Sequence, residues 1–108
     1  MKKLVRDKIP HILNEETKRL NPTFRAASVR EAQILLAEKL VEESQELLRA
    51  VSNGVGPSVL EEIVDIYEVW MTAAAFYGYH DVEIRGAAMR KRLDRGGFDE
   101  FIIMEYPE

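Results

Sequence analysis

The sequence predicts an all-α fold, a bundle of four to five helices, on three observations. Ser28 and Ser58 are each followed three residues later by a glutamate, Glu31 or Glu61, which is the pattern of a capping box at a helix start. A long run with apolar residues at alternating steps of three and four follows each box. The letters between the two runs, SNGVGP at residues 52–57, have the composition of a turn. Helices joined by so short a link usually pack antiparallel.

The other elements follow from similar start and stop signals. Asp7 can cap a first helix that Asn21 stops, and Gly96 ends a fourth helix. The expected helices cover about residues 8–20, 28–51, 58–77 and 81–94. The tail FDEFIIMEYP, at residues 98–107, has the composition of a short strand. It could pair with the extended start KKLVR at residues 2–6, so we also expect a short terminal β-strand pair.

Composition narrows the class of protein. With 108 residues, 46% of them hydrophobic, the chain is expected to form a single domain over 1–108. The net charge of -4 argues against a stable nucleic-acid partner, which usually demands a basic face. The absence of cysteine excludes a disulfide framework, a zinc ribbon and a thiol nucleophile. No stretch approaches the twenty apolar residues of a membrane span, so no membrane partner and a cytoplasmic location are expected.

Two carboxylate pairs at helical spacing are the most informative feature of the chain. Glu43 with Glu46, and Glu62 with Asp65, each present two acidic side chains to one side of a predicted helix. If the two helices pack antiparallel, the four carboxylates converge and repel one another. A hard divalent cation would remove that repulsion. Ligation by oxygen alone favours Mg²⁺, Mn²⁺ or Ca²⁺ over zinc or copper.

The alternative is a pair of solvated acidic helix faces balanced by lysine and arginine. Glu43 argues against it, because this residue falls on the apolar seam of its helix between Leu40 and Leu47. An unpaired acid in a core is costly. On the second helix, Glu62 and Asp65 each lie one position to the side of the seam.

The ordered motifs resemble the all-α nucleoside triphosphate pyrophosphohydrolases, the MazG-like and phosphoribosyl-ATP pyrophosphohydrolase-like superfamily, over about residues 36 to 98. The start KLVRDKIP and the late RGGF are similar to one compact subgroup of it. The matching motifs are EExxE at Glu42, Glu43 and Glu46, ExxD at Glu62 and Asp65, and KxxxR at Lys91 and Arg95.

The resemblance implies a chemistry and its residues. The four acids Glu43, Glu46, Glu62 and Asp65 would bind Mg²⁺, with Mn²⁺ as a possible substitute, and the substrate's phosphates would complete the coordination. Water would attack between the α and β phosphates of a nucleotide, giving a monophosphate and pyrophosphate. Glu42, or a ligand such as Glu43, would orient or deprotonate that water.

Three cations are the candidates for binding substrate phosphates: Lys39, Lys91 and Arg95. Arg6 and Lys8, in the subgroup's opening motif, are further candidates.

The family forms dimers or tetramers, so the resemblance also implies a homodimer or homotetramer. Nucleotide sensing without turnover and a ligand-free oligomerisation module remain alternatives, as does iron chemistry, which would need ExxH pairs that this sequence lacks. The base and sugar of the substrate stay open.

Overall fold

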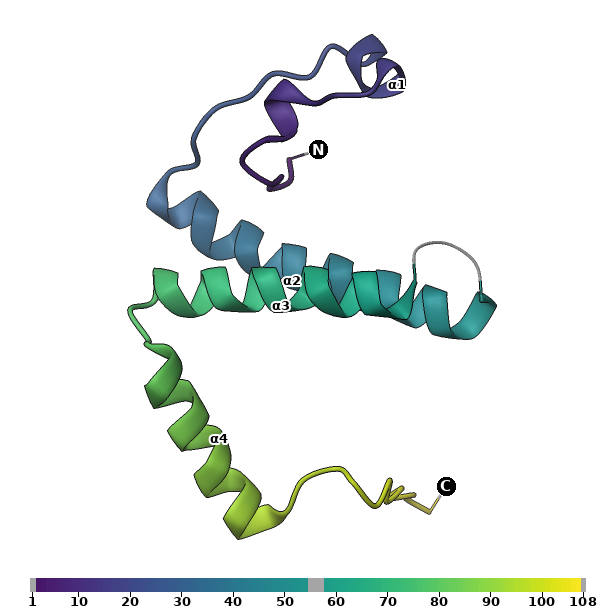
Figure 1. The fold of residues 1–108 in the computed structure, drawn as a ribbon, viewed down its shortest axis with the longest axis vertical. Coiled ribbons are helices and arrows are strands. Elements are labelled where there is room, and N and C mark those ends of the chain that lie inside the picture. Colours follow the sequence, from purple (N-terminus) through teal and green to yellow (C-terminus); the bar gives the residue numbers. More distant parts are fainter. Residues whose placement is uncertain (1, 55–57, 108) are drawn as a thin grey trace. The chain divides into compact units, whose positions relative to one another are not determined.

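The computed structural model describes residues 2–54 and 58–107 (Figure 1), and within these ranges the regular structure is entirely helical. The all-α prediction is confirmed. The elements are a 3₁₀ turn η1 (Ile9–His11) and the helices α1 (Glu15–Arg19), α2 (Val29–Asn53), α3 (Val59–Phe76) and α4 (Asp81–Arg95). The chain divides into two compact units, Met1–Ala73 and Ala74–Glu108, so that the last turn of α3 belongs to the second unit.

The single helix expected over about residues 8–20 is wrong. The structure has η1 and the short α1 in its place, separated by extended backbone at Asn14 (φ −79°, ψ 168°). The side chain of Asn14 accepts a hydrogen bond from the backbone N–H of Thr17 at 2.8 Å. Asn14 is thereby the N-cap of α1, which is a separate helix from η1. Asp7 is therefore not the cap. Asn21, with φ +50°, follows the end of α1 at the predicted place.

The predicted capping box at the start of α2 is confirmed. The Ser28 hydroxyl accepts from the Glu31 N–H at 3.2 Å, and the Ser28 N–H donates to Glu31 Oε1 at 3.0 Å. The Arg25 guanidinium holds both oxygens of the same carboxylate, with Nη1–Oε1 and Nη2–Oε2 distances of 2.8 and 2.6 Å. These hydrogen bonds keep the pKa of Glu31 well below its usual range. The start of α2 is thereby tied to the segment before it.

A glycine ends α2 and a serine cap begins α3. Gly54 adopts the left-handed conformation (φ +60°), which a glycine accepts without strain, and donates its N–H to the Ala50 carbonyl at 3.2 Å. The Ser58 hydroxyl accepts from the Glu61 N–H at 3.2 Å at the start of α3. Part of the turn predicted at residues 52–57 lies outside the described residues.

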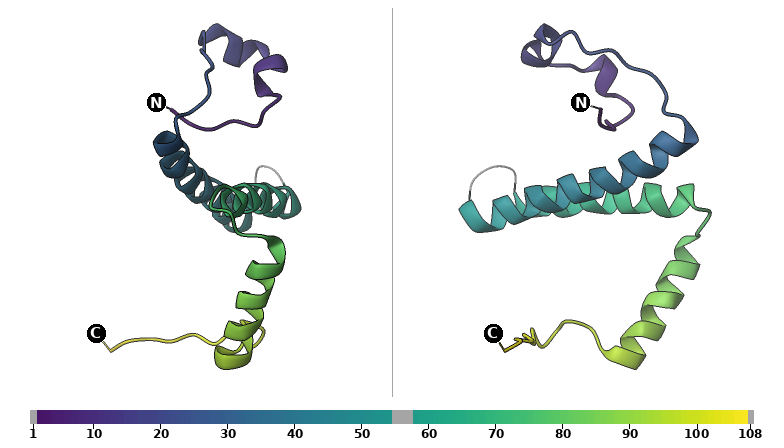
Figure 2. Two further views of the ribbon diagram at one scale, coloured as in Figure 1. Left: turned by 90° about the vertical axis from the view of Figure 1, so that its left-hand side faces the viewer. Right: turned by 180° about the vertical axis from the view of Figure 1, so that it is seen from behind.

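Helices α2 and α3 lie side by side and antiparallel, as predicted (Figures 1 and 2). Two apolar side chains of the pair, Leu36 and Ala50, are buried, and so are two acids, Glu43 and Glu62. Two carboxylates therefore lie among the most buried side chains of this helical hairpin.

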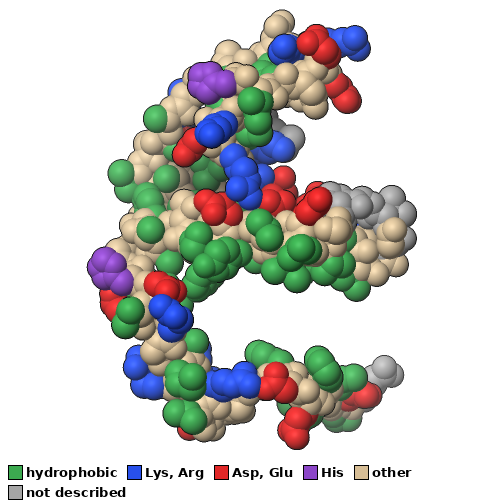
Figure 3. Space-filling model, in the orientation of Figure 1, with side chains coloured by type: hydrophobic (Ala, Val, Ile, Leu, Met, Phe, Trp, Pro, Cys, Tyr) green, Lys and Arg blue, Asp and Glu red, His purple; other side chains and the backbone are tan. Residues whose placement is uncertain are grey.

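The hairpin has two chemically different sides. Each residue of an α-helix is rotated about 100° around the helix axis from the residue before it. Viewed down the axis of α3, seven exposed apolar residues therefore fall within one arc of about 140°. The four acids of α3 lie outside that arc. Figure 3 shows hydrophobic side chains along the lower edge of the α2–α3 pair and carboxylates along its upper edge. We call the seven residues the apolar face: Val59, Leu60, Ile63, Val64, Tyr67, Trp70 and Met71.

In the second unit, α4 matches the helix expected over about 81–94. The His80 N–H donates to Glu83 Oε1 at 3.2 Å at its start, and the Gly96 N–H donates to the Arg92 carbonyl at 2.8 Å at its end. No helix of the described ranges is long and apolar enough to cross a membrane.

The predicted terminal strand pair is wrong, because residues 2–54 and 58–107 contain no strand. The tail turns instead of extending: the Phe101 N–H donates to the Phe98 carbonyl at 3.2 Å, and Phe101 itself has φ +52°. Arg92 of α4 forms an ion pair with Asp99 and holds the beginning of the tail against the helix. A positive φ interrupts an extended run, and a strand also needs a neighbouring edge with which to exchange hydrogen bonds.

Candidate metal centre

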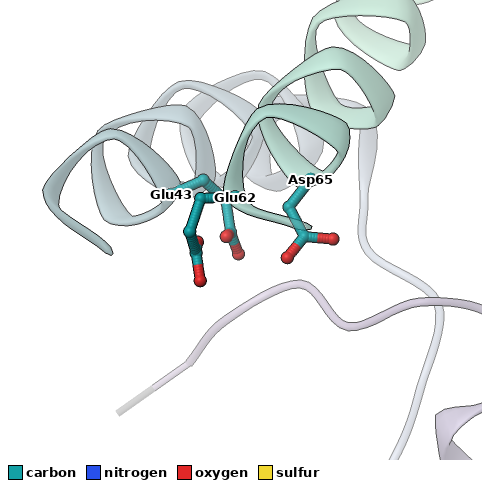
Figure 4. A group of neighbouring side chains, drawn as sticks. All are labelled: Glu43, Glu62 and Asp65. Atoms are coloured by element: carbon teal, nitrogen blue, oxygen red, sulfur yellow. The ribbon is translucent and has the colours of Figure 1, made fainter. Parts of the chain in front are cut away.

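Three carboxylates from two helices meet on the acidic side of the hairpin. Glu43 of α2 and Glu62 and Asp65 of α3 each offer one oxygen, and these oxygens lie within 4.8 Å of one another (Figure 4). The three side chains point in the same direction, toward the N-terminal segment. The spacing of three residues on α3 and the antiparallel packing of α2 produce this convergence. The structure therefore brings together three of the four predicted ligands.

Glu62 is the most buried member, with 2% of its surface exposed, and its Oε2 has no hydrogen-bond partner. Burial raises the pKa of Glu62 above its ordinary value, and the charges of Glu43, Asp65, Glu46 and Glu61 raise it further. A buried carboxylate is stable only when it is hydrogen-bonded, neutralised by a cation or protonated. Glu62 thus occupies a position that favours a bound cation.

The other two carboxylates of the cluster already have cationic partners. Lys39 Nζ lies 3.3 Å from Glu43 Oε1, one helical turn along α2. Arg6 Nη2 donates to Asp65 Oδ1 at 2.7 Å. Neither of these two cations forms an ion pair with Glu62.

The two remaining acids of the predicted EExxE motif lie beside the cluster. Glu42 is held by Lys39 at 3.4 Å and by Lys3 at 3.8 Å. Glu46 pairs with Arg49 of the same helix at 2.5 Å. The charge of Glu46 still acts on the cluster, since it contributes to the raised pKa of Glu62. The role of Glu46 as a metal ligand stays a prediction. So does the role of Glu42 in orienting or deprotonating the attacking water.

The predicted phosphate-binding cations divide between the two units. Lys39 contacts the cluster, as its position four residues before Glu43 predicts. Lys91 and Arg95 lie on α4 in the second unit, where Arg95 Nε is 3.7 Å from Asp94. Their role toward a phosphate stays a prediction.

Sequence spacing did not reveal the contact between Arg6 and Asp65. Fifty-nine positions separate the two residues, and no local pattern connects them. In the sequence only the opening motif, KLVRDKIP, which is similar to that of the subgroup, points to Arg6.

A hollow of about 310 Å³ lies between the N-terminal segment and α2. This volume is at the lower end of the range of small-molecule pockets. Two of its lining residues, Lys39 and Glu42, also contact or adjoin the cluster. The full lining is Lys2, Lys3, Leu4, Leu35, Glu38, Lys39 and Glu42.

Metal-free protein is expected to lose stability, relative to the Glu62→Gln variant, as the pH rises above 4.5, the ordinary pKa of this carboxyl. Because the pKa of Glu62 is raised in the folded chain, the folded state binds this proton more tightly than the unfolded state. Its contribution to stability is therefore present at low pH and is lost as the pH rises through the raised pKa. Melting temperatures of both proteins in EDTA, measured at a series of pH values, test this. Parallel curves would contradict it.

The donor set is chemically suited to a hard cation. All three converging side chains supply carboxylate oxygens, which Mg²⁺, Mn²⁺ and Ca²⁺ prefer. Three protein ligands also leave coordination positions for water or a substrate oxygen.

No protein-family model matches the chain, and neither a curated protein nor a solved structure matches it significantly.

Proposed function

We propose that the chain is a Mg²⁺-dependent nucleotide pyrophosphohydrolase, which cleaves a nucleoside triphosphate or a related nucleotide between the α and β phosphates. The observation that carries the proposal is the unpartnered, buried Glu62 oxygen beside Glu43 and Asp65. An acidic face that only met water would not bury a carboxylate against two others. The order of the motifs along the chain supports the choice of nucleotides as substrates.

In the proposed site Glu43, Glu62 and Asp65 hold the cation. When bound, the cation would lower the pKa of a coordinated water and stabilise negative charge on the phosphoryl oxygens. Glu42 or Glu43 would accept the proton of the attacking water as its oxygen bonds to the α phosphorus. The bond from the α phosphorus to the oxygen that bridges it to the β phosphorus would break, and pyrophosphate would leave. Lys39, next to both acids, would contact a phosphate oxygen.

Wild-type protein is expected to release pyrophosphate and a monophosphate from at least one member of a nucleoside triphosphate panel, with Mg²⁺ and not with EDTA. The products are identified by chromatography. Glu43→Gln should lower kcat/KM about a hundredfold, because it removes a charged ligand of the cation.

Glu68→Gln is the matched control for that experiment. It removes an acid of α3 that lies outside the cluster, and its activity should equal that of the wild type. Activity that survives Glu43→Gln unchanged would place the reaction elsewhere. Nucleotide binding by calorimetry without any product would instead favour a sensing function.

We also propose that the apolar face packs against a second copy of the chain. The face has no charge inside its arc of about 140°, so it is complementary to itself. The 18 residues of α3 extend over about 27 Å, and two helices side by side are about 20 Å wide, which gives a footprint of about 500 Å² before curvature. A stable complex buries ~800 Å² on each partner, so this flat footprint would supply the larger part of such an interface. The α2 half of the footprint carries exposed apolar side chains of its own: Val41, Leu48 and Val51.

Helix α4 carries a narrower apolar surface than the hairpin does. Along α4 the large exposed apolar side chains form only a narrow stripe, made of Val82, Met89 and Leu93. Five basic residues lie on the same helix. A second hairpin offers a broad uncharged surface, and α4 does not.

A further inference from the structure

Residues 2–6 carry three cations, and each forms an ion pair with a different carboxylate of the hairpin. Two of these pairs lie outside the three-carboxylate cluster, and only Arg6 reaches a member of it. The pairs are Lys2–Glu31 at 3.5 Å, Lys3–Glu42 at 3.8 Å and Arg6–Asp65 at 2.7 Å.

The two cations at the cluster differ in how firmly they are held. Lys39 is rooted in α2, and its side chain is 18% exposed against a Glu43 side chain that is 12% exposed. The Arg6 side chain is 55% exposed and that of Asp65 is 38% exposed. Ion pairs that contact water this freely are weak and exchange readily. Arg6 is therefore the cation that a stronger competitor would displace first.

The backbone around Arg6 allows such an exchange without refolding. The Arg6 carbonyl accepts from the Ile9 N–H at 3.0 Å and is anchored to the 3₁₀ turn. Its side chain can then leave Asp65 by rotation alone. A guanidinium also matches an oxyanion of phosphorus as well as it matches a carboxylate, because its N–H groups form a planar fork.

We propose that Arg6 is an exchangeable counter-ion: it neutralises Asp65 until a divalent cation takes that carboxylate, and then binds the anionic phosphate group of a ligand at the cation. The inference rests on the proposed metal centre. Beyond the phosphate-binding role expected for Arg6 from the opening motif, it assigns this residue two successive partners, first Asp65 and then the phosphate group.

The first test is the affinity for Mn²⁺ alone, measured on the full chain by the electron paramagnetic resonance of the free ion. Arg6→Gln removes the competitor for Asp65, so it should bind Mn²⁺ about two- to fivefold more tightly than the wild type. Lys2→Gln is the matched control, because its partner Glu31 lies outside the cluster, and its affinity should not change. An unchanged or weaker affinity in Arg6→Gln would overturn the inference.

The second test adds inorganic pyrophosphate to the Mn²⁺-saturated proteins and measures its binding by calorimetry. Here Arg6→Gln should bind about tenfold more weakly than the wild type, since it lacks a charged hydrogen bond to the phosphate. Arg6→Lys should fall between the two, because it restores the charge without the fork. Equal pyrophosphate affinity in all three proteins would refute the second partner of Arg6.

The two tests separate this inference from the proposed function. Absence of Mn²⁺ binding by the wild type, or equal binding by Glu62→Gln, overturns the metal centre and the inference together. Binding that requires Glu62 but is the same in Arg6→Gln overturns only the inference. Far-UV circular dichroism checks that each variant keeps its helices.

Discussion

Replacing Glu62 with glutamine is expected to weaken divalent-cation binding about a hundredfold or more and, at the same time, to stabilise the metal-free protein. Loss of a group that only supports a ligand already costs about 10- to 100-fold in metal affinity, so loss of a ligand should cost at least as much. The stabilisation has a different cause. Glutamine keeps the shape of the side chain but removes a buried charge, which lies within 4.8 Å of two other carboxylates.

This opposite response is measured by thermal melting with EDTA and with saturating Mg²⁺. The wild type should melt at a higher temperature with Mg²⁺, because a ligand that binds only the folded state stabilises it by mass action. Glu62→Gln should melt above the wild type in EDTA and show no shift with Mg²⁺. Glu68→Gln should follow the wild type in both conditions. A Mg²⁺ shift of equal size in wild type and Glu62→Gln would rule out the centre described above.

A second large effect is expected at the middle of the apolar face. Tyr67→Glu places a carboxylate near the centre of the arc, where it would meet the same charge of a second copy and lose its water. The substitution also removes the ring that stacks on Trp70, with centroids 5.8 Å apart. We expect self-association to weaken by about a thousandfold or more, since like charges in an interface cost several kcal/mol.

Sedimentation equilibrium over a range of concentrations tests this. The wild type should have the mass of an oligomer and Tyr67→Glu that of one chain. Glu68→Gln alters the neighbouring position outside the apolar arc and should remain an oligomer. Tyr67→Glu should still bind Mn²⁺, because the α3 members of the cluster, Glu62 and Asp65, lie outside the apolar arc. A wild type that has the mass of one chain at every concentration would contradict the proposed interface.

The long helices were predictable because their signals are local. The serine caps placed the starts of α2 and α3 within a residue, and glycines marked the ends of α2 and α4. The N-terminal helix failed for an equally local reason, since Asn14 competed successfully with Asp7 as a cap. The tail strand failed because strand pairing depends on residues far apart in sequence, which a composition of apolar residues cannot identify.

In the site, too, the local features were predictable and the contacts between distant residues were not. Spacing on each helix and the short link between them predicted that Glu43, Glu62 and Asp65 would meet. Which acid is most buried was less accessible: the apolar seam pointed to Glu43, whereas Glu62 is the less exposed, at 2% against 9%. The contact of Arg6 with Asp65 depends on how an irregular segment crosses the hairpin, and helical periodicity carries no information about that path.

The opposite placement of acids and apolar residues on α3 limits how this part of the chain can change in length. One residue inserted between Ile63 and Asp65 would turn the rest of the helix by about 100°. Asp65 would rotate away from Glu43, and Trp70 would leave the surface it shares with Ile63. Descendants of this chain can therefore exchange side chains along α3, but insertions and deletions there would be eliminated even where every individual residue is well tolerated.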